Sequence, residues 1–142
     1  MKKTLAYFLY TMLVACIVCA CSDHLDIIQN YGFDLQTLPV PKTVVQGDTV
    51  EIRCQLVKQG DYKEARYFIR SFQTDGKGEL HLDDGTLLTP NDLFPLTKDV
   101  FRLYYISHST GQQNIDIYIV DNNGQVVEKS FSFTGESIET VE

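Results

Sequence analysis

Residues 49–56 read Thr49-Val50-Glu51-Ile52-Arg53-Cys54-Gln55-Leu56. Apolar and polar side chains alternate along this stretch, and successive side chains of a β-strand point to opposite faces of its sheet. Val50, Ile52, Cys54 and Leu56 would therefore share one face, while charged and amide side chains would share the other. The stretch predicts a strand with one buried face and one face in water, as in a two-layered β-protein.

The same alternation recurs farther along the chain. It is found at residues 100–106, 114–120 and 130–133, with inward positions predicted for Phe101, Leu103, Tyr105, Ile115, Ile117, Ile119, Phe131 and Phe133. Residues 65–72 are rich in β-forming residues but apolar on both faces. Turn residues separate these segments, and Asn122-Asn123-Gly124 between two alternating runs indicates a β-hairpin.

The number and spacing of these segments predict an all-β fold, an immunoglobulin-like β-sandwich of about seven strands over residues 33–134. A chain of 142 residues suits one such domain. Residues 88–96, with Pro90 and Pro95, are expected to form a long irregular connection. Residues 135–142 are acidic and are expected to form a flexible tail.

The N-terminal segment indicates export. Lys2 and Lys3 precede an apolar run that ends at Ala20, and this pattern is typical of a secretory signal peptide, here residues 1–20. A transmembrane helix is the alternative interpretation. The run is near the lower limit of roughly 17–25 residues for spanning a bilayer, and acidic rather than basic residues follow it. We therefore favour the signal peptide.

The end of the apolar run, Val18-Cys19-Ala20-Cys21, resembles the signal of bacterial lipoproteins, in which the cysteine after the cut carries the lipid. The resemblance implies lipidation of Cys21, with residues 21–32 as a lipidated tether. Leu13-Val14-Ala15-Cys16 is a second candidate, but cutting before Cys16 would leave apolar residues on the mature arm. We expect a lipid-anchored protein of the cell envelope, at the outer membrane. The sequence does not distinguish the periplasmic face of that membrane from the cell surface.

The net charge and the cysteine content argue against direct nucleic-acid binding and for a structural role of the last cysteine. The net charge is −7, and loss of residues 1–20 removes Lys2 and Lys3 but no acid, which makes it −9. Direct binding of nucleic acid is not expected, because phosphates are neutralised by Lys and Arg. Of the four cysteines, only Cys54 follows position 21, and its place on the apolar side of a strand predicts a buried core residue.

No motif indicates catalysis, and the chain is predicted not to be an enzyme or to need a cofactor. His81 and His108 lie in separate segments and lack metal-ligand spacing, so surface positions are expected. Asp83-Asp84-Gly85, with Asp92, could offer carboxylates to calcium, but the EF-hand pattern is absent. Asp-Asp-Gly is also an ordinary hairpin turn, and we prefer this second interpretation.

Aromatic residues in the central strands give the best candidate for an interaction surface. If one face of each strand is core, then Tyr104, Ile106, Tyr118 and Val120 point outward. Outward aromatic and β-branched side chains could form a patch for a partner protein. Cross-strand pairing on a half-exposed sheet is the simpler alternative.

A series of short motifs runs in order through the part of the chain after Cys21. It comprises Leu38-Pro39-Val40-Pro41-Lys42, Glu51-Ile52-Arg53-Cys54-Gln55-Leu56, Asp75-Gly76-Lys77-Gly78, Leu82-Asp83-Asp84-Gly85-Thr86, Pro90-Asn91-Asp92, Pro95-Leu96-Thr97-Lys98, Phe101-Arg102-Leu103-Tyr104-Tyr105 and Asp121-Asn122-Asn123-Gly124-Gln125. Together these motifs resemble the TraQ-type conjugal transfer lipoproteins of Bacteroidetes conjugative transposons. The resemblance implies a lipid anchor, a compact all-β domain and membership of a transfer operon, and it carries over no binding residues besides Cys21.

These observations predict a non-enzymatic, membrane-anchored accessory or scaffold protein of a conjugative transposon transfer apparatus. Its partners would be other proteins of that apparatus, and its acyl chains would hold it at the membrane. A surface module that binds a glycan or a host protein is the alternative, because sandwich domains serve many functions.

The anchor can be tested at a single residue. We expect Cys21→Ala to remove the acyl attachment point and to release the protein from the membrane fraction, because two or three acyl chains bury many CH₂ groups at about 0.8 kcal/mol each. The measurement is the distribution of the protein between membrane and soluble fractions, with Cys16→Ala as the matched control. A Cys21→Ala protein that still sediments with membranes would move the anchor to Cys16.

Overall fold

The computed structural model describes residues 1–17 and 31–138. Within these ranges the chain forms one N-terminal helix, α1 (Lys2–Ile17), and a β-domain. The strands of the domain are β1 (Phe33–Thr37), β2 (Thr43–Val45), β3 (Thr49–Lys58), β4 (Tyr67–Asp75), β5 (Gly78–Leu82), β6 (Phe94–Leu96), β7 (Val100–Ser107), β8 (Gln112–Asp121) and β9 (Val126–Glu136).

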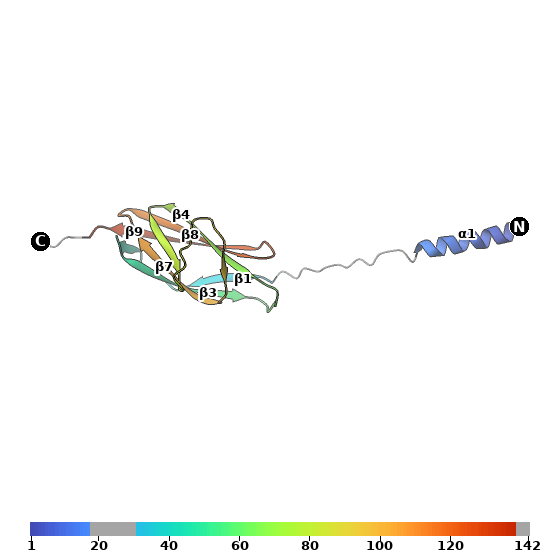
Figure 1. Ribbon diagram of the computed structural model, residues 1–142, viewed down its shortest axis with the longest axis horizontal. Helices are drawn as coiled ribbons and strands as arrows, with labels where there is room; N and C mark the ends of the chain where they lie inside the picture. The colour runs from blue at the N-terminus through green and yellow to red at the C-terminus, as the bar shows by residue number, and fades with distance from the viewer. Residues whose placement is uncertain (18–30, 139–142) are drawn as a thin grey trace.

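The strands form two sheets that pack face to face (Figure 1). A four-stranded sheet has the order β1-β3-β7-β5, and a five-stranded sheet has the order β2-β9-β8-β4-β6. Neighbouring strands are antiparallel, except that β2 runs parallel to β9. This arrangement confirms the predicted β-sandwich, but with nine strands in the described ranges where about seven were expected.

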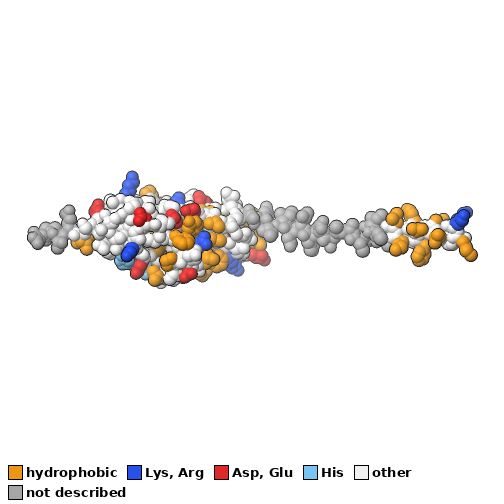
Figure 2. Space-filling model, turned by 90° about the horizontal axis from the view of Figure 1, so that it is seen from above, with side chains coloured by type: hydrophobic (Ala, Val, Ile, Leu, Met, Phe, Trp, Pro, Cys, Tyr) orange, Lys and Arg blue, Asp and Glu red, His pale blue; other side chains and the backbone are white. Residues whose placement is uncertain are grey.

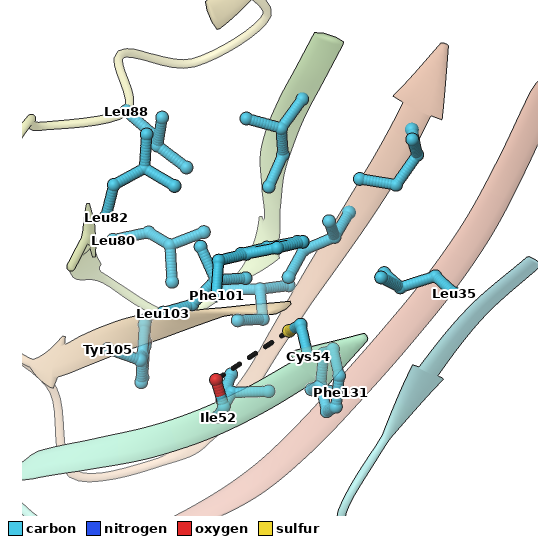
Figure 3. Packing of buried hydrophobic residues seen from close by; sticks show 14 of the residues in the cluster. Leu35, Ile52, Cys54, Leu80, Leu82, Leu88, Phe101, Leu103, Tyr105 and Phe131 are labelled. Atoms are coloured by element: carbon cyan, nitrogen blue, oxygen red, sulfur yellow. Dashed lines mark hydrogen bonds between the residues drawn. The ribbon is translucent and has the colours of Figure 1, made fainter. Parts of the chain in front are cut away.

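Alternation along each strand separates the core from the surface. In β3 the side chains of Val50, Ile52, Cys54 and Leu56 are buried, as the opening stretch predicts. The inward positions predicted for β7, β8 and β9 are all buried as well. Figure 3 shows how side chains from both sheets meet in this core, with Leu35, Phe101 and Phe131 around Cys54.

The hairpin between β8 and β9 also forms as predicted, with Val120 opposite Val126. The Asp121 carboxylate accepts hydrogen bonds from the backbone N–H of Asn123 (3.0 Å) and of Gln125 (2.7 Å). Gly124 adopts a φ of 85°, a conformation that glycine reaches without steric strain. The turn chemistry therefore sets the register of the two strands.

Two short strands depart from the expected organisation. Residues 88–96 were predicted to be irregular throughout, but β6 occupies their end, and Pro95 lies opposite Phe68 of β4. The sheet tolerates Pro95 because β6 is an edge strand, where a missing N–H breaks no ladder. β2 was not expected either, since three residues are too few for a periodic signal. At the other end of the domain, β9 runs to Glu136, past the expected boundary at residue 134.

A buried polar network closes one end of the core. The Gln113 side chain is fully buried, and its Oε1 accepts hydrogen bonds from Tyr105 (2.7 Å) and Ser107 (2.9 Å) of the opposite sheet. Its Nε2 donates to the carbonyl oxygen of Ser109 at 3.1 Å. The Tyr105 hydroxyl in turn accepts a hydrogen bond from Gln73 of β4. One amide thus joins the two sheets.

We expect Gln113→Ala to destabilise the domain by about 2–4 kcal/mol, because it opens a cavity and removes the nearest hydrogen-bond acceptor of the Tyr105 and Ser107 hydroxyls. Urea denaturation of the two proteins measures the difference. Gln112→Ala is the matched control, since the neighbouring side chain is exposed and should lose less than about 0.5 kcal/mol. Equal losses for the two variants would contradict the structural role of Gln113.

Candidate functional site

The predicted anchor, Cys21, lies outside the described residues. α1 covers most of the apolar segment before it, including position 16. In the described ranges, no helix combines the length and the apolar character that a membrane span requires. Lipidation at Cys21, the signal peptide and the tether therefore stay predictions.

Cys54 is a core residue that is almost completely buried. Its side chain is 2% exposed, and its Sγ lies 3.7 Å from the carbonyl oxygen of Ile52 (Figure 3). Burial raises the pKa of the thiol to about 12, so the thiol is protonated at neutral pH. Since the thiolate is the nucleophilic form, the structure gives Cys54 a packing role.

The structure brings together two histidines that the sequence separates. His81 of β5 lies 3.1 Å from one Glu79 oxygen, and His108, just beyond β7, lies 3.5 Å from the other. Hydrogen bonding to His81, helped by the charge of His108, lowers the pKa of Glu79. Only the pairing of β5 with β7 creates this cluster. The cluster is not a metal site. Among the described residues, no group of three or more His, Cys, Asp or Glu side chains is placed so that it could hold a metal ion.

The acidic turn after β5 has structural partners of its own. Asp84 accepts a hydrogen bond from the backbone N–H of Thr86 at 2.9 Å, and this contact with Thr86 lowers its pKa. Gly85 has a φ of 88°. Asp92 accepts a hydrogen bond from the Thr89 hydroxyl. These contacts are those of ordinary turns, as the simpler interpretation expects.

The four predicted interaction residues lie on two opposite surfaces. Tyr104 and Ile106 are on the outer face of the four-stranded sheet, and Tyr118 and Val120 are on the outer face of the five-stranded sheet. All four are half-buried. Because the core lies between the sheets, the two pairs cannot form one patch.

Tyr118 and Val120 belong to a larger apolar surface. We call it the β4–β8 face and define it by Phe68, Arg70, Phe72, Tyr118 and Val120. Phe68 lies opposite Val120, and Arg70 lies opposite Tyr118. Phe72 meets the Tyr118 ring edge-on, with 6.2 Å between ring centres. Figure 2, which views the side where Figure 1 draws β4 and β8, shows hydrophobic side chains gathered around a basic one.

Arg70 is the polar centre of the β4–β8 face. Its guanidinium carbon lies 5.1 Å from the centre of the Tyr118 ring, a cation–π contact. Its Nε is buried and makes no hydrogen bond, and across the described residues no carboxylate lies within ion-pair distance of it. The sequence left open whether Tyr67 or Phe68 points outward, because residues 65–72 are apolar on both faces, and it gave no reason to single out Arg70.

Comparison with known proteins identifies the family of this chain. Residues 4–136 match the family described as TraQ conjugal transfer protein. The chain belongs to that family. The match spans nearly the whole chain, so it confirms the resemblance drawn from the short motifs. The TraQ conjugal transfer family is not a known enzyme family.

Solved structures agree with the assignment of this TraQ-family protein. It is 41% identical to a conjugative transposon lipoprotein from Bacteroides eggerthii, with a TM-score of 0.69, over 73% of this chain and 98% of that one. It is 48% identical to a lipoprotein from Bacteroides thetaiotaomicron, with a TM-score of 0.69, over 86% and 98% of the two chains.

A third relative also bears on how the domain folds. It is a conjugate transposon protein from Bacteroides vulgatus, 40% identical with a TM-score of 0.67, over 84% of this chain and 97% of that one. Its solution structure is of residues 27–141, so a domain of this kind folds without the N-terminal segment. No curated protein matches the sequence.

The burial of the thiol can be tested by its reactivity in the domain without its N-terminal segment, residues 22–142. At pH 8 we expect Cys54 to react with a disulfide reagent at least about a hundredfold more slowly than an exposed thiol, since it is both covered and protonated. The control is a variant with an added surface thiol, Ser132→Cys on β9. Urea should abolish the difference. Equal rates in the native state would contradict the assigned burial.

Proposed function

We propose that this protein is a lipid-anchored accessory or scaffold component of a conjugative transposon transfer apparatus, and that it acts through protein contacts rather than catalysis. The observation that carries the proposal is the family match over residues 4–136. A relative described as a conjugative transposon lipoprotein supports it further. The anchor would be Cys21, in the cell envelope and at the outer membrane.

The β4–β8 face is the best candidate for the contact with another transfer protein. Tyr, Phe and Arg are enriched in protein interfaces, and Tyr and Arg often contribute most of the binding energy. Phe72 is 37% exposed, and Val126, beside Val120, is 53% exposed, so apolar area is available for burial. The Arg70 guanidinium lies over an aromatic ring, and among the residues that the structure describes no carboxylate is within ion-pair distance of it. A partner that covers this face would bury apolar area and offer Arg70 an acceptor.

Deletion and complementation in a donor strain test the role. We expect deletion of the gene to lower the transfer frequency of the element and the intact gene to restore it. Transfer at the unmodified frequency after deletion would exclude a role as a component of the apparatus.

The docking face is tested with the double variant Arg70→Ser/Tyr118→Ser. Truncating interface hot spots costs about 2 kcal/mol or more each, so we expect contact with the partner to weaken at least tenfold and transfer to fall. Tyr104→Ser, on the opposite sheet, is the matched control and should transfer normally. Immunoblots of the membrane fraction show whether each variant accumulates. Normal transfer by an accumulated double variant would remove this face from the proposal.

A further inference from the structure

A groove lies on the outer face of the four-stranded sheet, on the side of the domain opposite the β4–β8 face. It has a volume of about 390 Å³ and crosses β3 where β1 ends and β7 begins. Leu38, just after β1, and Val100, the first residue of β7, line it from the two sides. Arg53 of β3 and Arg102 of β7 line it as well.

The two arginines lie directly opposite each other on neighbouring antiparallel strands. Like charges at such positions destabilise a sheet, so stability alone does not account for the pair. The one carboxylate within ion-pair distance of either arginine, among the described residues, is Glu51. Its Oε1 lies 2.7 Å from the Nε of Arg53 and 3.6 Å from the Nε of Arg102.

Within ion-pair distance the arginine pair therefore has an excess positive charge of one; the charge of Asp83 also acts on Arg102, but Asp83 has its own ion pair with Lys98. Two guanidinium groups share one carboxylate, in a protein whose net charge is −7. Hydrogen bonding to Arg53 and the positive charge of Arg102 lower the pKa of Glu51, so this carboxylate is ionised at neutral pH. The side chains of Arg53 and Arg102 are 58% and 51% exposed, so both are open to a ligand.

We infer that this groove is a binding site for a carboxylate side chain of an acidic peptide segment, held by Arg53 and Arg102. The planar guanidinium presents donors in a fork that matches a carboxylate. Leu38 and Val100 are 56% and 67% exposed and would contact apolar residues that flank the acid. The ligand is therefore a Glu or Asp between apolar residues, in an extended segment lying across the strands.

Charge distinguishes a carboxylate from other anions at this site. A single carboxylate neutralises the excess charge of one, whereas a dianionic phosphate would bring an unpaired negative charge next to Glu51. The overall negative charge of the protein opposes binding to an anionic lipid surface in the same way. This carboxylate site is separate from the docking surface proposed on the β4–β8 face. The evidence for the carboxylate site does not depend on that docking proposal.

The test is an NMR titration of the domain without its N-terminal segment, residues 22–142, with the capped peptide acetyl-Leu-Glu-Leu-amide. We expect saturable chemical-shift changes confined to residues near 36–38, 53–55 and 100–102. The same peptide with Gln in place of Glu, inorganic phosphate, and vesicles with anionic lipid are the comparison ligands. We expect each of them to bind at least about tenfold more weakly, since charge-assisted hydrogen bonds to the arginines would be lost or opposed.

Substitutions in the pair should have opposite effects. Arg53→Gln and Arg102→Gln should each weaken the acidic peptide about tenfold or more, while Glu51→Gln should strengthen its binding, because the competing carboxylate is gone. Lys63→Gln, which removes a positive charge from an exposed loop position outside the groove, is the matched control and should leave binding unchanged. Each variant is first checked for a native spectrum.

Several results would overturn the inference. These are shift changes elsewhere in the domain, equal binding of the Gln peptide, weaker peptide binding by Glu51→Gln, and no saturation at millimolar peptide. Tighter binding of phosphate or of anionic vesicles would show a phosphate site in place of a carboxylate site. None of these results bears on transfer frequency, so a failure here is distinct from a failure of the proposed scaffold role.

Discussion

The hydrogen bonds to the buried Gln113 amide hold the two sheets at a set distance and alignment at one end of the sandwich. Tyr105 and Ser107 reach it from β7, and the Tyr105 ring stacks on Phe133 of β9 with 5.3 Å between ring centres. An unsatisfied buried amide would be costly, so the strands must align to satisfy it. Apolar contacts are less demanding, because they are non-directional and tolerate small shifts between the layers.

Glycines surround this network for a steric reason. A Cβ added at Gly76 would lie 2.6 Å from the Gln113 side chain, and one at Gly135 would lie 2.7 Å from it. A Cβ at Gly78 would lie 2.4 Å from the Tyr105 hydroxyl. The backbone of two separate segments, the β4–β5 turn and the end of β9, therefore comes close to the polar groups, and a side chain at any of these glycines would push the network apart.

With the layers held in this way, the sandwich presents two outer faces of different character. The β4–β8 face carries aromatic rings around one arginine. The outer face of the four-stranded sheet carries an arginine pair on β3 and β7 with a shared glutamate. Two histidines also lie close to Glu79 of β5. In the proposed scaffold role both faces can be used at once, because ligands on opposite sides of the core do not compete for space.

The two layers, the inward positions of the long strands and the β8–β9 hairpin were predictable from the sequence, because alternation and turn chemistry act locally. The sequence also indicated the family and the predicted anchor at Cys21. Which outward residues share a surface was not predictable without the fold. Tyr118 has Phe68, Arg70 and Phe72 as neighbours, and the core separates it from Tyr104. The fold likewise opposed Arg53 to Arg102 and gathered His81 and His108 around Glu79. Strand order and register set these neighbours, and both depend on long-range packing that no local pattern records.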